Sequence, residues 1–325
     1  MHSLAGALYS ASQVRDLDRR AIHDLGIPGY ELMSRAGRAT LDALCALWPT
    51  ARSIAVLCGP GNNGGDGYVV ARLARAQGLR VTVVALGDPG ALTGDARRAY
   101  DEFVAAGGRC EGWSPGALES DVVVDALFGT GLARALDGAA ASMIAAVNAS
   151  GRPVVAVDVP SGLQADTGAV LGAAMHADLT VTFIGRKIGL YVGEGLDHVG
   201  RVLLDDLAVP PETYDGAIPL ARLIGDATVA PALPRRARTS HKGAHGHVLV
   251  VGGGPGMPGA ARLAGEAALR AGAGLVTLAV HPESTGVVAT RPELMCVAAR
   301  AARDIERALG RATIVAVGPG LGQGW

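Results

Sequence analysis

Short apolar runs alternate with segments of helical periodicity along most of the chain. Near the N-terminus, Ser10 and Gln13 have the spacing of a capping box, and apolar residues then recur every three or four positions. This pattern predicts a helix over about 11–25. The segment 26–29, which contains Gly and Pro, interrupts the pattern, and a second helix is predicted over about 30–47.

A series of apolar runs typical of strands follows, at 53–58, 81–86, 121–126, 153–157, 179–183 and 202–204. Most of them lack polar alternation, as is usual for parallel strands that are covered on both faces. Segments with helical periodicity at 67–77, 95–106 and 139–149 separate the first four runs. The order predicts right-handed βαβ crossovers, and therefore a Rossmann-like, doubly wound α/β domain with three αβα layers.

A domain boundary is predicted at 216/217, because residues 209–219 hold three prolines and few strong helix or strand formers. A second α/β pattern follows, and the sequence closes in a Gly-rich turn. Its predicted strands are 247–251, 275–280 and 313–317, and its predicted helices are 260–271 and 304–309. Three strands are few for a doubly wound domain, so 217–325 is predicted to be an incomplete α/β domain.

Composition and charge narrow the possible partners. Hydrophobic residues make up 49% of the chain and charged residues 18%, which is typical of a folded globular protein. The net charge is −1 and no basic run is interleaved with aromatics, so nucleic acid is not an expected partner. We see no secretory leader and no uncharged apolar run of the roughly 18 residues that a membrane helix needs. With four dispersed cysteines, the chain is expected to be cytoplasmic.

The sharpest local feature is the segment 58–67, Cys-Gly-Pro-Gly-Asn-Asn-Gly-Gly-Asp-Gly, between a predicted strand and a predicted helix. Glycines allow the backbone to approach a ligand closely, and a helix N-terminus favours phosphate groups. The segment is neither a GxGxxG nor a GxxxxGK[ST] loop. A turn that is Gly-rich only for packing is the alternative, but two asparagines and an aspartate exceed what a turn needs.

Two aspartates, Asp125 and Asp158, end successive predicted strands, and Gly-rich segments follow at 128–134 and 159–162. The carboxyl ends of parallel strands form the ligand crevice of such sheets, which favours one shared site. The alternative is that each aspartate caps the next helix. Oxygen ligands in this crevice would also suit a hard cation, whose identity the residues leave open. Lys187 is expected on a solvated or ligand-side loop rather than as a nucleophile.

These motifs together resemble the YjeF-like N-terminal domain, the NAD(P)H-hydrate epimerase family. The matching segments are Gly59-Pro-Gly-Asn-Asn-Gly-Gly-Asp-Gly67, Val-Val-Asp125-Ala-Leu-Phe-Gly-Thr-Gly131, Val-Asp158-Val-Pro-Ser-Gly162 and the earlier Glu31-Leu-Met-Ser-Arg-Ala-Gly37. The resemblance covers roughly residues 10–215.

The second part resembles the ADP- or ATP-dependent NAD(P)H-hydrate dehydratase, a ribokinase-like domain that is often fused behind the epimerase. The matching segments are 241–243, 252–260, 269–275, 292–295 and 317–322. The family's late Gly-Thr-Gly-Asp motif, with its nucleotide loop and catalytic aspartate, does not occur before residue 325. The dehydratase part is therefore predicted to be truncated and inactive, and ADP or ATP would be a co-substrate only if it were complete.

The resemblance implies a set of site residues. Asp158 would be the catalytic residue and would face the hydrated nicotinamide ring, and Asn63, Asp125 and Ser161 would bind a potassium ion. In the second domain, Ala260 and Gly320 match substrate contacts. The implied contacts with the hydrated dinucleotide are Asn62, Asn63, Gly64, Gly65, Asp66, Gly129, Thr130, Gly131, Leu132, Ala133, Arg134, Ala135 and Asp158.

The implied activity interconverts the R and S epimers at C6 of hydrated NADH and NADPH (NADHX and NADPHX), and the family suggests a homodimer. Three alternatives remain. An NAD-dependent oxidoreductase is disfavoured because GxGxxG is absent and no acidic residue stands cleanly at the end of the second strand. A sugar or vitamin kinase would need the missing Gly-Thr-Gly-Asp motif. A non-enzymatic nucleotide-binding or scaffold module is disfavoured because the glycines, Asn63, Asp125 and Asp158 are all present.

Overall fold

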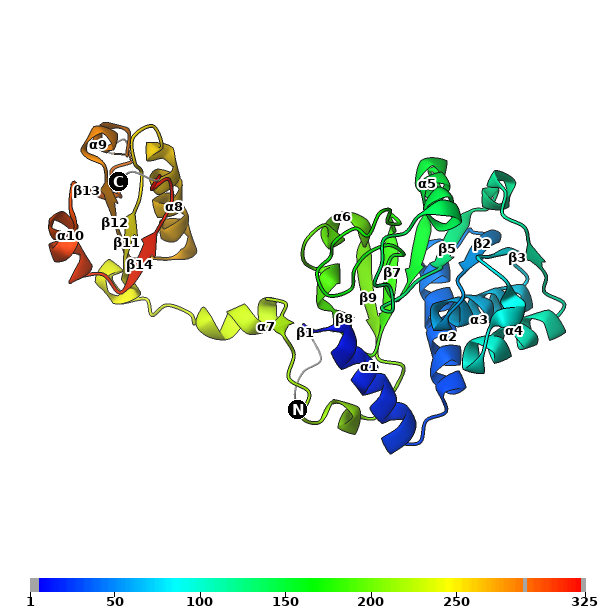
Figure 1. Ribbon diagram of the computed structural model, residues 1–325. Helices are drawn as coiled ribbons and strands as arrows, with labels where there is room; N and C mark the ends of the chain where they lie inside the picture. The colour runs from blue at the N-terminus through cyan, green and yellow to red at the C-terminus, as the bar shows by residue number, and fades with distance from the viewer. Residues whose placement is uncertain (1–5, 289–290, 323–325) are drawn as a thin grey trace. The chain divides into compact units, whose positions relative to one another are not determined.

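The computed structural model describes residues 6–288 and 291–322, and the chain divides into two compact units, Met1–Val229 and Ala230–Trp325 (Figure 1). The division falls thirteen residues after the boundary placed at 216/217. The intervening residues include strand β10 (Ala221–Arg222), which pairs antiparallel with β1 (Ala7–Tyr9) of the first unit. This pairing attaches residues 217–229, including the short helix α7 (Asp226–Val229), to the first unit.

The first unit is built on a parallel sheet of seven strands in the order β4-β3-β2-β5-β6-β7-β9. The order reverses beside β2, so the ends of β2 and β5 flank a topological switch point, as the prediction of a doubly wound sheet requires. The strands are β2 (Ser53–Cys58), β3 (Arg80–Ala85), β4 (Cys110–Glu111), β5 (Val122–Ala126), β6 (Val154–Val157), β7 (Leu179–Phe183) and β9 (Arg201–Asp205).

Helices cover both faces of this sheet, so the predicted three-layer architecture is confirmed. Alternate residues of β2 belong to different cores: Ile54 packs with the cluster formed by α2, α3 and α4, and Leu57 packs with the cluster formed by α5. The side chains of a strand alternate between the two faces of the sheet, and both faces are covered here. This explains why the sequence of β2 is apolar on both faces. The helices are α2 (Gly29–Leu47), α3 (Asn62–Ala76), α4 (Gly94–Ala105), α5 (Gly138–Ser150) and the short α6 (Gly195–His198).

Helix α1 (Ala11–Arg19) begins with the predicted capping box and continues into a π-helical turn at Arg20–Asp24. The strand before it, β1, lies between β10 and β8 (Arg186–Lys187) in a small second sheet. The register pairs Tyr9 with Lys187, so the start of α1 lies beside the segment that follows β7. None of these short strands was predicted, because two or three residues give no periodic signal.

The prediction for α3 was wrong at its start. The helix begins at Asn62 instead of residue 67, so the Asn-Asn-Gly-Gly-Asp segment forms its first turns. Glycine lowers intrinsic helix propensity, which is why the sequence pattern indicated a loop there. Tertiary packing overrides this preference, because a Cβ on Gly64 would lie 2.0 Å from the Gly59 carbonyl oxygen.

The second unit contains a parallel sheet of four strands in the order β13-β12-β11-β14. Strand β13 and helix α9 were not predicted, whereas the other elements lie close to their predicted positions. The core contains Val250, Val276 and Leu278 under helix α8. The elements are β11 (His247–Val251), α8 (Pro258–Ala271), β12 (Leu275–Val280), α9 (Thr285–Val288), β13 (Met295–Ala298), α10 (Ala302–Leu309) and β14 (Ile314–Val317).

No helix within residues 6–288 and 291–322 combines the length and the apolar character needed to cross a membrane.

Candidate active site

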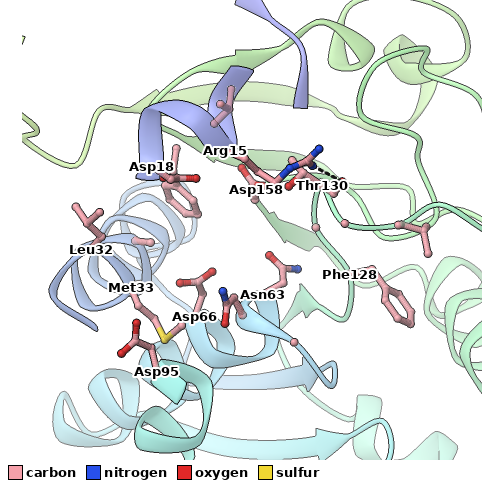
Figure 2. A pocket seen from close by; sticks show the side chains of 18 of the residues that line it. Arg15, Asp18, Leu32, Met33, Asn63, Asp66, Asp95, Phe128, Thr130 and Asp158 are labelled. Carbon is pink, nitrogen blue, oxygen red and sulfur yellow. Dashed lines mark hydrogen bonds between the residues drawn. The ribbon is translucent and has the colours of Figure 1, made fainter. Parts of the chain in front are cut away.

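A cavity of about 790 Å³ opens at the carboxyl edge of the first unit's sheet (Figure 2). Its walls come from α1, α2, the start of α3, the segment after β5, and Asp158 at the end of β6. This volume lies within the usual range of ligand sites. Residues named from the sequence that line it are Asn62, Asn63, Asp66, Gly129, Thr130, Gly131, Leu132, Ala133, Arg134 and Asp158.

Gly64, Gly65 and Ala135 do not belong to the cavity lining. A Cβ on Gly65 would lie 2.7 Å from the terminal carbon of Met33, and a Cβ on Gly64 would meet the backbone of Gly59. These two glycines therefore let the start of α3 pack against the loop before it and against α2. The lack of a side chain at these two positions thus allows close packing inside the protein.

Asp125 is fully buried under the loop after β5, and it is held by Ser161. The Ser161 hydroxyl donates to Asp125 Oδ1 at 2.6 Å and the Ser161 backbone N–H donates to Oδ2 at 2.8 Å. Burial raises the pKa of Asp125 to about 6, and the hydrogen bonds from Ser161 and Leu127 oppose the rise. No cationic side chain in the described part of the chain forms an ion pair with this carboxyl group.

Asn63 carries a buried polar atom that lacks a partner. Its Nδ2 forms no hydrogen bond with the described residues, and the side-chain amide faces the loop at Gly129. A Cβ on Gly129 would lie 3.2 Å from Asn63 Oδ1 and 3.5 Å from Asp158 Oδ2, so this glycine separates the two side chains. Within residues 6–288 and 291–322, no group of three His, Cys, Asp or Glu side chains is arranged to hold a metal ion.

Asp158 has left-handed backbone geometry, with φ at 68°. A non-glycine residue with this φ is uncommon, and such strain concentrates at functional sites. The Asp158 N–H donates to the Val181 carbonyl at 2.7 Å, which fixes the turn, and its Oδ1 accepts a hydrogen bond from Thr182 at 3.2 Å. The carboxylate also forms an ion pair with Lys187.

Lys187 was not predicted as a site residue; of the two placements expected for it, solvated or on the ligand side, the structure shows the second, because Lys187 is buried and lines the cavity. Its side chain is 2% exposed, and Nζ donates to Thr182 Oγ1 at 3.2 Å and to the Phe183 carbonyl at 3.1 Å. The turn that brings Lys187 back has left-handed geometry at Ile184 (φ 62°), whose carbonyl accepts a hydrogen bond from Tyr214. The local sequence gives no signal for this placement, because it depends on the pairing of β8 with β1, which was not predicted.

Helix α1 adds two charged residues that the sequence analysis missed. Arg15 and Asp18 line the cavity, and the Arg15 guanidinium donates to the Thr130 carbonyl at 3.4 Å. Burial raises the pKa of Asp18 to about 6. Burial also raises the pKa of Asp66 well above its usual range, and the charges of Asp158 and Asp18 add to the rise. In the sequence, both α1 residues fit an ordinary amphipathic helix and gave no functional signal.

The chain matches two known protein families. Residues 29–189 match the family described as YjeF-related protein N-terminus, and residues 248–324 match the family described as NAD(P)H-hydrate dehydratase. Residues 29–189 are therefore a YjeF-related domain. In the YjeF-related unit, the match includes Asn63, Asp125, Asp158 and Lys187, whereas α1 precedes it.

Curated relatives contain both parts. A bifunctional NAD(P)H-hydrate repair enzyme of Coxiella burnetii is 46% identical over 318 residues, which is 97% of this chain and 65% of that protein. The bifunctional enzyme of Escherichia coli is 42% identical over 99% of this chain and 62% of its own length. The chain thus spans somewhat less than two thirds of the relatives that it matches.

The YjeF-related unit also has a structural neighbour. The crystal structure of the yeast protein ynu0 superposes with a TM-score of 0.57 at 20% identity, and it covers 67% of this chain and 97% of the yeast chain. At this identity the likeness shows the fold alone. In the second unit, Gly320 has φ at 63°, and a Cβ there would lie 2.9 Å from the Ala260 Cβ, so the two residues named from the sequence lie together.

Proposed function

We propose that the YjeF-related unit is an NAD(P)H-hydrate epimerase that interconverts the two C6 epimers of NADHX and NADPHX. The observation that carries the proposal is the strained, ion-paired Asp158 on the wall of a cavity that also includes the N-terminus of α3. A helix N-terminus and the arginines Arg15 and Arg134 suit the phosphates of a dinucleotide. The names of the relatives agree with this activity.

The reaction needs proton exchange at the C6 oxygen. C6 adjoins the ring nitrogen, so loss of the hydroxyl group, assisted by the nitrogen lone pair, gives an iminium ion, and re-addition of water to the other face inverts the centre. Reversible ring opening would also invert it. Asp158 exchanges the proton, and Lys187 and Thr182 hold its carboxylate in place. No electrons are transferred, so the dinucleotide is the substrate.

The buried oxygens beside this cavity fit the potassium ion that the sequence resemblance implies. Asp125 is a fully buried carboxyl without a cationic partner, Ser161 adds a hydroxyl, and the Asn63 amide has an unsatisfied atom. Oxygen ligands of this kind bind hard cations, and amide oxygen and nitrogen are assigned from the hydrogen-bond network. A bound potassium ion would balance the Asp125 charge and hold the loop after β5.

Thermal unfolding tests the potassium proposal without an activity measurement. Potassium chloride should raise the Tm of the wild-type chain relative to choline chloride at equal ionic strength, because the ion binds the folded state. Asp125→Asn should lose this difference. Equal Tm values for the wild type in both salts would contradict the proposal.

The second unit by itself is proposed to lack dehydratase turnover. Its edge strand β14 exposes 61% of Ile314 and 63% of Val317, whereas strands of parallel sheets are usually covered on both faces. Release of NADH from NADHX in the presence of ADP or ATP by this chain alone would contradict this. The homodimer and the cytoplasmic location stay predictions.

The deciding assay uses a mixture of the two NADHX epimers and an intact, independent dehydratase that consumes one of them. The slow phase left by spontaneous epimerisation should disappear when this chain is added in potassium buffer. Folded Asp158→Asn should restore the slow phase, since the proton-exchanging group is gone. If the folded wild-type chain leaves the slow phase unchanged, the epimerase function is refuted.

A further inference from the structure

Helix α1 forms one wall of the cavity, although it precedes residue 29, where the YjeF-related match begins. Val14, Arg15 and Asp18 of this helix, and Ile22 of the turn after it, line the space. Residues three or four apart share a helical face, so α1 presents one face to the cavity. Among these four side chains, only the Asp18 carboxyl group can exchange a proton near neutral pH.

The Asp18 carboxyl group is available to a ligand. Its side chain is half-buried, and its oxygens accept no hydrogen bond in the part of the chain that the structure describes. Figure 2 shows the carboxyl groups of Asp18, Asp66 and Asp158 around one open space, each from a different element. Bound substrate would therefore meet a carboxyl group from α1 as well as one from the sheet edge.

The surroundings of Asp18 and Asp66 change their capacity to exchange a proton. Burial raises the pKa of Asp18 to about 6, with Lys187 opposing the rise and Asp158 adding to it. Burial, together with the charges of Asp158 and Asp18, raises the pKa of Asp66 well above its usual range. A group whose pKa is close to the working pH is the more effective acid and base. Asp18 meets this condition.

The charges around Asp18 also favour a cationic intermediate. Lys187 of β8 is already paired with Asp158, and Arg15 points to the Thr130 carbonyl. The charged and titratable groups that surround Asp18 are Arg15 on α1, Asp66 on α3, Asp158 after β6, Lys187 on β8 and Tyr214 near the end of the unit. Loss of a proton from Asp18 leaves a carboxylate in the cavity, which suits a positively charged iminium ring.

We propose that Asp18 is a second proton-exchanging residue of the site, acting from α1 while Asp158 acts from the sheet edge. This rests on the proposed epimerase function. The Asp18 carboxylic acid gives its proton to the C6 hydroxyl group, the C6–O bond breaks as the nitrogen lone pair forms C=N, and water leaves. Water then adds to the opposite face of the iminium carbon and loses a proton to Asp158. The reverse reaction exchanges the two roles, and solvent restores the starting protonation.

The test compares Asp18→Asn, Asp18→Glu and Asp16→Asn in the coupled epimerase assay between pH 5 and 9. Asp18→Asn should lower kcat by ~100-fold or more with little change in KM, and should lose the pH dependence near 6. Asp18→Glu, which keeps a carboxyl group, should recover part of the rate. Asp16 lies on the same helix with a side chain 61% exposed, so Asp16→Asn should behave as wild type.

Two failures are distinguishable. A folded wild-type chain without epimerase activity would refute the proposed function itself. An active wild type, together with an Asp18→Asn variant of equal kcat and unchanged pH profile, would refute the role of Asp18 alone. Thermal unfolding of each variant shows whether a reduced rate comes from the loss of the proton donor or from the loss of the fold. If Asp18→Asn does not fold, the rate and pH profile of Asp18→Glu decide instead.

Discussion

Asp158 and Lys187 form an ion pair in the interior of the candidate site. Lys187 is almost completely buried and Asp158 is 15% exposed, so neither charge is well solvated. Removing one partner of such a pair is costly because the other charge is left without compensation, whereas removing both is much less so. The pair therefore predicts a non-additive pattern in stability.

We expect Lys187→Met to lower the free energy of unfolding of the first unit by about 3 kcal/mol. The double variant Asp158→Asn/Lys187→Met should be more stable than Lys187→Met, and urea unfolding with a double-mutant cycle measures the difference. The only other lysine, Lys242, is exposed, so Lys242→Met serves as the control and should be neutral for this unit. Additive effects of the two single changes would show that the pair is not coupled.

Asp18 should lower stability at the pH at which it acts. Its pKa in the folded state, about 6, lies above the ordinary value of 3.8, so between these values the unfolded chain releases a proton that the folded chain keeps. The contribution of protonated Asp18 to the free energy of unfolding is therefore lost progressively as pH rises from about 4 to 6, and is fully lost above that. Asp18→Asn should then be more stable than wild type at pH 8, by about 1–3 kcal/mol, and equal to it near pH 3.

Denaturant unfolding of wild type and Asp18→Asn at the two pH values measures this effect. Asp16→Asn, whose carboxyl group is exposed, should show no such difference. Equal stability of wild type and Asp18→Asn at pH 8 would mean that the carboxyl group is fully solvated. A variant that gains stability while losing turnover would be typical of a residue kept for function at the expense of stability.

At the scale of elements, the junction between β2 and α3 depends on glycines. A Cβ on Gly64 would lie 2.0 Å from the Gly59 carbonyl oxygen, and the neighbouring atoms are backbone, which cannot move aside. We expect Gly64→Ala to displace the start of α3, to lower the Tm by several degrees and to weaken substrate binding. Gly112→Ala, with nothing within 4 Å of the added carbon, is the control. A Gly64→Ala variant with wild-type Tm would contradict the packing.

The sequence predicted the regular elements well and the start of α3 poorly. The apolar run Ser53–Cys58 coincides with β2, because burial on both faces favours apolar residues, and the predicted strand at 179–183 coincides with β7 although two threonines alternate with its apolar residues. The start of α3 was missed because close packing, which propensity does not contain, keeps glycines inside a helix. Lys187 was missed because its position depends on a β1–β8 pairing between segments far apart in sequence.

The positions of those candidate site residues that lie in sequence motifs could be predicted. Asp125 lies at the end of β5, and Asn63, Asp158 and Ser161 follow the ends of β2 and β6, so the rule that parallel strands share a carboxyl edge is enough to bring them together. Arg15 and Asp18 lie on a helix whose pattern is explained by its buried face alone. Their place in the cavity follows from tertiary packing, for which a single sequence gives no local signal.

At the scale of the whole molecule, each unit has its own hydrophobic core. The two large clusters lie on either face of the seven-stranded sheet, and the cluster around Val250 and Leu278 belongs to the second unit. A domain with its own core is expected to fold alone. We therefore expect a chain of residues 1–229 to fold and to keep the epimerase rate of the full chain.

A fragment that ends at residue 216 should instead lose β10 and have a lower Tm, because β10 pairs with β1, the strand before α1. Circular dichroism and the coupled assay on both fragments measure this, and an inactive, unfolded 1–229 fragment would mean that the site needs the second unit.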